Sequence, residues 1–421
     1  MTLSRGTQDR CEATRIRPFQ GRTLLGACFR GRCPISAKIS LDNEICVSYS
    51  EGMNALDEDW KILVGLLPPN WQRAARLSGA VERLRGFDSL NEVLRVLLMH
   101  VGCGYSLRET AVRAKAAGIA EVSDVTLLNR LRQAEGWLQH LCQALLEESG
   151  VQWRGPQPRR RLRAVDGTVI KEPGPTGSQW RVHYSLLLPE LTCDHLSITA
   201  TEGADTAERL ERFPVAAGDI ILADSGYCHP SGVGRVARQG ADVIVRLNSS
   251  VPLFGADDRR FPLLPQVRQL QTAGSIRQWP AWMHDRGQRL AGRLCAVRKS
   301  EQAIACAQRR IDRREQKHQH RVKPETREFA CYVMIFTTLL DSVLGAAEVL
   351  EYYRFRWQIE LVFKRLKSIL AVGHLPKHDE QSSRAWLYGK LFVALLTQKL
   401  VRLGSSISPW GYDLGSTTPT Q

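Results

Sequence analysis

The spacing of apolar and polar residues predicts a helical region over residues 60–149 of this 421-residue chain. Apolar residues recur three and four positions apart over Leu90–Leu98, as on one face of a helix. Ser106, with Glu109 three residues later, is typical of a capping box, which predicts that a helix begins there. After a short glycine turn, a second helix is expected over Val125–Leu145, with Ser123 or Asp124 as its cap. Two helices joined in this way indicate either a DNA-binding helix-turn-helix or an ordinary helical hairpin.

After Arg154 the pattern changes to short apolar runs that are typical of β-strands. Five strands are predicted, at Leu162–Val165, Val182–Leu188, Leu196–Thr201, Ile220–Ala223 and Val243–Leu247. Helical segments are expected over Thr206–Phe213 and Ser231–Gln239. Three strands in succession, followed by alternating helices and strands, predict a mixed α/β sheet that is flanked by helices.

Residues 249–330 interrupt this rhythm. They begin as a polar, proline-containing stretch and become very basic at Arg309–Lys317, so we interpret them as an insertion into the sheet domain. An apolar strand is expected next, over Phe329–Thr337, followed by one long helix from about Asp341 to Leu370.

The composition adds the sign of the charge and argues against a membrane protein. Lys and Arg number 58 against 43 Asp and Glu, giving a net charge of +15, which favours an acidic partner such as nucleic acid. The excess is concentrated in Arg154–Arg163 and Arg309–Arg327. No apolar run approaches the ~18 residues of a membrane span, and the N-terminus lacks the apolar run of a secretion signal. We therefore expect a cytoplasmic protein without membrane association.

Two aspartates are candidate functional residues because each follows a predicted strand. Asp166 follows Leu162–Val165 and precedes Gly-Thr, and Asp224 follows Ile220–Ala223 and precedes Ser-Gly-Tyr. Ligand sites in open sheets favour strand ends, where side chains converge. The alternative is that each aspartate is only a turn residue, since Asp-Gly and Asp-Ser-Gly are common turn sequences.

A third acid, Glu360, lies among cations on the predicted long helix. At ~100° per residue, Tyr353, Arg356, Glu360 and Lys367 share one narrow stripe. The adjoining apolar face is expected to be buried and contains Phe355, Ile359, Val362, Phe363, Leu366 and Leu370. A solvated charged face is the ordinary interpretation of such a stripe. The position of one carboxylate between cations, beside the buried face, favours a phosphate-binding role instead.

The same four residues match the Y-x2-R-x3-E-x6-K signature at every spacing. Over roughly residues 55–403 the chain therefore resembles the bacterial DDE transposases of insertion-sequence family four. The resemblance implies an RNase H-like catalytic domain in which Asp166, Asp224 and Glu360 bind two Mg²⁺ (or Mn²⁺) ions. Three carboxylates suffice for this because hard divalent ions prefer oxygen ligands.

The resemblance also implies contacts with double-stranded DNA, both the terminal inverted repeats and the target. Tyr353, Arg356 and Lys367 would hold the DNA end near the cleaved phosphate. Trp279 and Trp282 of the insertion are further DNA-binding candidates, because an aromatic ring there could stack on an extruded base. Core packing is the alternative role for either tryptophan. A homodimer in a synaptic complex, associated with the bacterial nucleoid, is implied by the family as well.

The predicted fold is a mixed α/β fold in which a β-rich insertion interrupts the catalytic domain and an all-helical DNA-binding domain precedes it. The expected segments are a disordered arm or incorrect start at 1–52, the helical domain at 53–150, the first part of the core at 151–248, the insertion at 249–330, the second part of the core at 331–403, and a flexible tail at 404–421. The expected function is metal-dependent cleavage and strand transfer in cut-and-paste transposition. The alternatives are a catalytically dead or domesticated sequence-specific DNA-binding protein, and an RNase H-like nuclease that does not join strands.

Overall fold

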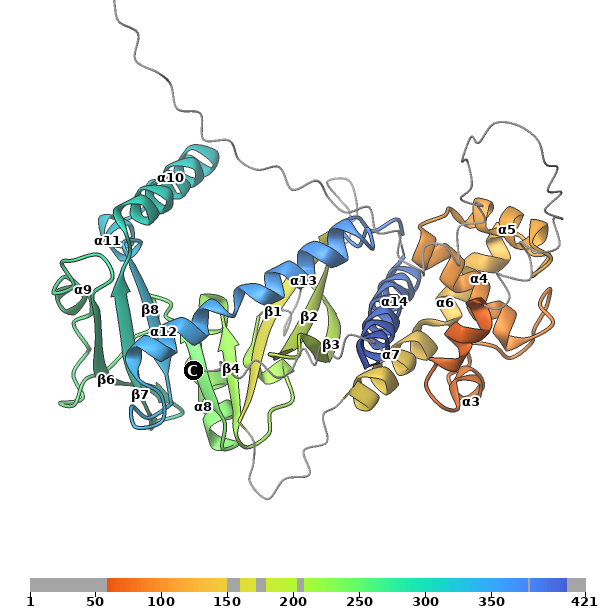
Figure 1. The fold of residues 1–421 in the computed structure, drawn as a ribbon. Helices are drawn as coiled ribbons and strands as arrows, with labels where there is room; N and C mark the ends of the chain where they lie inside the picture. Colours follow the sequence, from red (N-terminus) through yellow and green to blue (C-terminus); the bar gives the residue numbers. More distant parts are fainter. Residues whose placement is uncertain (1–58, 150–159, 172–178, 203–207, 378, 407–421) are drawn as a thin grey trace, which may run out of the picture.

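A mixed eight-stranded sheet lies at the centre of the computed structural model, which describes residues 59–149, 160–171, 179–202, 208–377 and 379–406 (Figure 1). The strands are β1 Arg161–Lys171, β2 Gln179–Leu188, β3 Thr192–Ala200, β4 Asp219–Ala223, β5 Asp242–Arg246, β6 Ile276–Asp285, β7 Gln288–Arg298 and β8 Tyr332–Thr337. The helices are α3 Trp71–Leu77, α4 Leu90–Cys103, α5 Leu107–Ala116, α6 Asp124–Gln133, α7 Glu135–Ser149, α8 Pro230–Arg238, α9 Leu263–Val267, α10 Glu301–His318, α11 Pro324–Phe329, α12 Ala346–Arg354, α13 Trp357–Ser368 and α14 Glu380–Ser406. Residues 59–65 are also helical.

The strand order is β3-β2-β1-β4-β5-β8-β7-β6. Strands β1 to β3 form an antiparallel meander, and β4 and β5 run parallel to β1. This half of the sheet is consistent with the RNase H-like fold that the resemblance implies. The other half, β8, β7 and β6, is antiparallel throughout.

Alternate residues of the central strands divide the core between the two faces of the sheet. Ala164 and Leu222 face one core cluster, which also contains the buried residues of α12 and α13. Val165 and Ile221 face the second cluster, which contains the buried residues of α8. Because both faces are covered by helices, the central strands are apolar on both sides.

The N-terminal helices pack with the C-terminal helix α14, which contacts α7, α4 and α6 (Figure 1). The caps of α5 and α6 form as their sequences indicate, since Ser106 Oγ accepts from Glu109 N (3.1 Å) and Ser123 Oγ accepts from Thr126 N (3.1 Å). The helix expected over Val125–Leu145 is instead two helices, α6 and α7, which meet at Ala134. No helix in the described ranges is long and apolar enough to cross a bilayer.

The long helix expected from Asp341 to Leu370 is divided into α12 and α13. Across the junction the backbone bonds span three residues, from Phe355 N to Tyr352 O (3.0 Å) and from Arg356 N to Tyr353 O (3.1 Å), so the helix tightens into a 3₁₀-like turn. The turn leaves Phe355 42% exposed, although the helical pattern predicted that it would be buried.

Other boundaries also differ from the sequence pattern. β1 continues past its predicted end at Val165 to Lys171, so Asp166 lies within a strand that is paired with β2. Of the helix expected over Thr206–Phe213, the described part is a 3₁₀ turn at Leu210–Arg212. β8 begins at Tyr332, because Phe329 ends α11.

The segment at 249–330 is partly helical and does not form a separate sheet. Its strands β6 and β7 extend the main sheet through the pairing of β7 with β8, and α9, α10 and α11 complete it. α14 runs through Gly404 to Ser406, so residues 404–406 of the expected tail are helical. The expected arm at 1–52 lies outside the described residues.

Candidate active site

The register of the sheet places Asp166 and Asp224 beside each other. β1 and β4 are parallel neighbours, and their last paired residues are Ala164 and Leu222. Continuing this register by two residues brings Asp166 level with Asp224, on strands that are ~4.8 Å apart. β4 ends at Ala223 while β1 continues, so the two carboxylates lie where the backbone of β4 leaves the sheet.

Each aspartate is oriented by a backbone amide of the next residue. Asp166 Oδ1 accepts from Gly167 N at 2.8 Å, and Asp224 Oδ1 accepts from Ser225 N at 2.6 Å. Burial raises the pKa of Asp166 to about 6, and the negative charges of Glu208 and Asp224 add to this, against the opposing effects of the Gly167 amide and Arg356. The site therefore holds negative charge that the protein compensates only in part.

Helix α13 packs against β1 and places Arg356 between two acids. The guanidinium of Arg356 lies 3.6 Å from Asp166 Oδ2 and 2.5 Å from Glu360 Oε1. It also lies near the ring of Tyr353, with Cζ 5.8 Å from the ring centre. Burial raises the pKa of Tyr353 to about 12, and Asp224 contributes in the same direction while Arg356 opposes it. Arg356 and Tyr353 thus lie near the aspartates, and Glu360 is linked to Asp166 through Arg356.

The remaining signature residue, Lys367, is exposed near the C-terminal end of α13. It lies seven residues beyond Glu360, about 10 Å along the helix. The structure therefore brings Tyr353, Arg356 and Glu360 together and leaves Lys367 at the far end of the same helix.

The donor chemistry of the site fits a divalent cation. Carboxylate oxygens are the ligands that Mg²⁺ and Mn²⁺ prefer, and the raised pKa of Asp166 reports a buried acid that a cation would stabilise in its ionised form. The side chain of Glu360 is half exposed and bonded to Arg356. Among the described residues no three carboxylate, His or Cys side chains are close enough to hold one ion. The two aspartates are thus the metal ligands that are already in place, and Glu360 can become the third ligand only if it leaves Arg356.

Two further residues, Glu208 and Tyr227, border the aspartates, and the sequence pattern did not single them out. Glu208 packs against Gly226, where any side chain would collide with its carboxylate, and it lies 4.0 Å from Arg181. The hydroxyl of Tyr227 is fully buried, has no hydrogen-bond partner among the described residues, and lies 3.4 Å from where a Cβ on Gly167 would be. Burial, and then the charges of Asp166 and Glu208, raise the pKa of Tyr227 well above its usual range. The sequence signal for this group is the Ser-Gly-Tyr that follows Asp224, since its glycine makes room for Glu208.

Trp279 and Trp282 lie away from the aspartates. Both are on the edge strand β6, which β5, β8 and β7 separate from β4, about 19 Å across the sheet. Trp279 packs against the core beside Phe261, with ring centres 6.2 Å apart. Trp282 is on the opposite face, where Nε1 donates to Asp258 Oδ1 (3.2 Å). Within one chain, neither ring is near the aspartates.

The arginines that open β1 are structural, which changes the interpretation of the basic run at 154–163. Arg163 is 2% exposed and pairs with Asp194 (2.7 Å) and Asp219 (3.0 Å), and Arg161 also pairs with Asp219 (2.7 Å). They lie at the start of β1, three and five residues before Asp166. Residues 154–159 lie outside the described residues.

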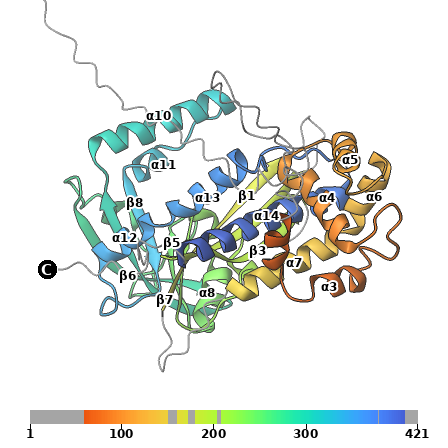
Figure 2. The same cartoon turned by 45° about the vertical axis from the view of Figure 1, so that its right-hand side comes forward.

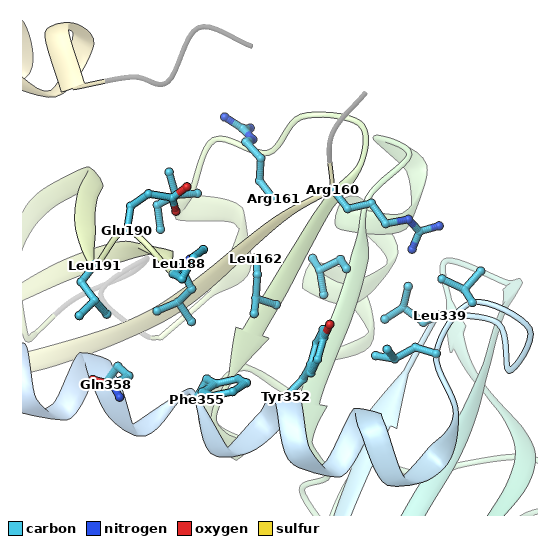
Figure 3. Close-up of a pocket in the computed structure, with 15 residues that line it drawn as sticks. Arg160, Arg161, Leu162, Leu188, Glu190, Leu191, Leu339, Tyr352, Phe355 and Gln358 are labelled. Carbon is cyan, nitrogen blue, oxygen red and sulfur yellow. The ribbon is translucent and has the colours of Figure 1, made fainter. Parts of the chain in front are cut away.

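A cavity of about 710 Å³ lies beside the start of β1 (Figure 3). Tyr352 and Phe355 point from the α12–α13 junction toward Leu162 of β1, and Leu188 closes another side. The lining is mostly apolar and contains none of the three candidate acids, so we place the chemistry at the aspartates and not in this cavity.

The comparisons with known proteins find similarity to transposases. Residues 157–396 match the family model described as "Transposase DDE domain". The protein InsL for insertion sequence element IS186A of Escherichia coli (strain K12) is 32% identical over 367 residues, 85% of this chain and 98% of that protein. The transposase for insertion sequence element IS421 of Escherichia coli is 32% identical over 368 residues, with the same coverage. The transposase for IS231F of Bacillus thuringiensis subsp. israelensis is 26% identical over 196 residues, 42% of this chain and 41% of that protein.

Proposed function

The chain belongs to the family of transposase DDE domains, a family of phosphoryl-transfer enzymes, and from this premise we propose that it moves an insertion sequence by cutting DNA and joining the released ends to a target. The observation that carries the proposal is the convergence of Asp166 and Asp224 on adjacent strands beneath α13. α13 carries Glu360 and begins directly after Arg356, and Arg356 pairs with both Glu360 and Asp166.

In this proposal Asp166, Asp224 and Glu360 hold two Mg²⁺ or Mn²⁺ ions. Two such ions supply Lewis-acid activation of the attacking hydroxyl and stabilise the leaving oxygen of a phosphodiester. Asp166 and Asp224 are fixed by backbone amides, so they would bind without a large rearrangement. Glu360 would join them by exchanging its bond with Arg356 for the metal site, which frees the Arg356 guanidinium for DNA.

The cations of the signature would hold the DNA end beside the carboxylates. Arg356 can bind a phosphate through two parallel N–H bonds, and Lys367 contributes a compact charge further along α13. Tyr353, next to Arg356, would restrict how that guanidinium turns. Trp279 and Trp282 are proposed as base-stacking residues only for DNA that reaches β6, such as DNA held by a second copy in a synaptic dimer.

The deciding experiment uses DNA that flanks the coding region, because a transposase acts on inverted repeats at those ends. The protein is incubated with supercoiled plasmid carrying that DNA, with Mg²⁺ or with EDTA, and nicked and joined products are measured. We expect Mg²⁺-dependent nicking and joining by the natural protein and loss of both in Asp224→Asn. Asp257→Asn, at an exposed aspartate of the insertion, is the matched control and should retain both.

Two outcomes would contradict the proposal. Binding without any nicking would indicate a DNA-binding protein that has lost catalysis. Nicking without joined products would indicate a nuclease on the same fold. Mn²⁺ titration by calorimetry tests the metal site separately: weakened binding is expected in Asp166→Asn and Asp224→Asn, and unchanged binding in both would remove these residues from the metal site.

A further inference from the structure

Helix α10 has two chemically distinct faces. With Ile304 at 0° and ~100° per residue, the half-buried residues lie between about −60° and 80°. They are Ile304, Ala307, Gln308, Ile311, Asp312 and Glu315. The two acids of this face share one cation, because Arg327 of α11 pairs with Asp312 (2.8 Å) and Glu315 (2.7 Å). The inner face therefore attaches α10 to α11, and its two acids point away from the outer face.

The outer face carries only cations over its last three turns. Five exposed side chains lie between about 140° and 280° by the same construction. They are Arg309, Arg310, Arg313, Arg314 and Lys317. None of the five forms an ion pair with the residues that the structure describes. Three pairs four residues apart have like charge, and such pairs destabilise a helix. Repulsion between the cations of the outer face thus destabilises the helix, and a polyanion bound along this face would relieve the repulsion.

The sheet places α10 at the edge where the candidate acids lie. β7 is antiparallel to β8, which is antiparallel to β5, so β7 and β5 run in the same direction. β5 is parallel to β4, so the C-terminal ends of β4, β5 and β7 point to one edge of the sheet. α10 begins at Glu301, directly after β7, and stands above α13 in both views (Figures 1 and 2).

Other cations connect this edge to the outer face. Lys299 precedes α10, and its pKa is lowered by burial and then by the positive charges of Arg246 and Arg310. Arg246 ends β5 and also acts on Tyr353 of the candidate site. Positive charge therefore continues from the neighbourhood of Asp224, through Arg246 and Lys299, to the first cations of α10.

We propose that the outer face of α10 binds the phosphate backbone of duplex DNA that extends from the cleavage site. Arg309 to Lys317 span about 12 Å of helix axis, which matches three or four phosphates of one strand at ~3.4 Å each. Contacts of this kind carry no base preference, so the face positions DNA of any sequence. The inference rests on the proposed function, because it assumes that the bound polyanion is the DNA substrate.

The test measures how binding depends on salt. A fluorescent duplex of about 30 base pairs with random sequence is titrated in EDTA, over roughly 50–300 mM KCl. The triple substitution Arg310→Gln, Arg313→Gln and Arg314→Gln should lower the slope of log Kobs against log salt by about 2–3 and weaken binding at least tenfold at 100 mM salt.

Two control variants test whether the effect depends on where the charge is removed and whether it comes from the loss of charge. Arg259→Gln, Arg260→Gln and Arg286→Gln remove the same charge from exposed residues near the β6–β7 turn, away from the edge that carries α10, and should leave the slope unchanged. Replacing Arg310, Arg313 and Arg314 by lysine should restore the slope of the natural protein, since lysine keeps the charge.

An unchanged slope in the glutamine triple, or an equal fall in its matched control, would overturn the inference. An unchanged slope would leave an acidic protein as the candidate partner of the outer face. The proposed function fails differently: the natural protein would then bind DNA without a steep slope or would not cleave it with Mg²⁺, whatever the α10 variants do.

Discussion

Replacing Asp166 by asparagine should stabilise the metal-free protein while it removes a candidate metal ligand. The side chain of Asp166 is 18% exposed and lies close enough to the negative charges of Glu208 and Asp224 and the positive charge of Arg356 to be affected by them. Asparagine is nearly the same size, and its amide oxygen can still accept from Gly167 N. The substitution therefore removes the charge and retains most of the local packing.

The expected gain follows from the difference in pKa between the folded and unfolded states. Burial raises the pKa of Asp166 from 3.8 to about 6, so ionisation disfavours the folded state, by about 3 kcal/mol once the pH is well above 6. Below pH 3.8 the side chain is neutral in both states and the penalty disappears. At pH 5 the penalty is about 1.6 kcal/mol, because the unfolded state is mostly ionised and the folded state is not.

Urea denaturation in EDTA at pH 8, pH 5 and the lowest pH at which the protein remains folded measures this difference. The natural protein and Asp166→Asn should differ by about 3 kcal/mol at pH 8 and converge as the pH falls. Asp257→Asn, at an exposed site, should show no such dependence. Adding Mg²⁺ should stabilise the natural protein more than Asp166→Asn, because a ligand stabilises the state that binds it. A variant that is less stable than the natural protein at pH 8, or equally shifted at every pH, would refute the electrostatic reasoning.

Three further substitutions test separate parts of the structure. Asp219→Asn should lower the free energy of unfolding by about 3 kcal/mol or more, because it leaves the buried Arg163 without one of its carboxylate partners. Urea denaturation measures this, and a decrease below about 1 kcal/mol would contradict it. Gly292→Ala should lower the free energy of unfolding by about 1–3 kcal/mol, since the new Cβ would lie 2.6 Å from a backbone oxygen of β8 and against the ring of Phe336. A calorimetric Tm equal to that of the natural protein would contradict this close packing of β7 against β8. Tyr227→Phe removes a buried hydroxyl that has no hydrogen-bond partner in the part of the chain that the structure describes, so the free energy of unfolding should be unchanged or slightly higher. Urea midpoints measure this, and a loss of stability would mean that the hydroxyl is bonded in the metal-free protein.

The sequence was most informative where function depends on local geometry. Residues on a helix have a fixed angular spacing, so the signature from Tyr353 to Lys367 could be placed on one side of a helix without any tertiary information. The capping serines Ser106 and Ser123 act within four residues, and both helices begin where those caps predict. The 3₁₀-like turn at Phe355 could not be predicted from the sequence, because the helical spacing of apolar residues continues on both sides of it.

The strand pattern predicted the order of the elements but not the position of Asp166 within them. Asp-Gly is a common turn sequence, and only pairing with β2 carries the strand through it. Likewise, the charges of Arg161 and Arg163 look in the sequence like those of α10. Burial against Asp219 makes the first pair structural, and exposure leaves the second group available to a ligand.

The sequence by itself therefore determined local features: the faces of helices, their caps, the apolar runs of buried strands, and the four-residue signature. The tertiary structure alone decided which distant residues meet. It places Glu208 and the hydroxyl of Tyr227 beside Asp166, packs α14 against the N-terminal helices, and separates Trp279 from the aspartates by the width of four strand spacings. The physical reason is that strand register and helix packing depend on contacts between residues far apart in the chain, whereas periodicity and capping depend on neighbours within about four residues.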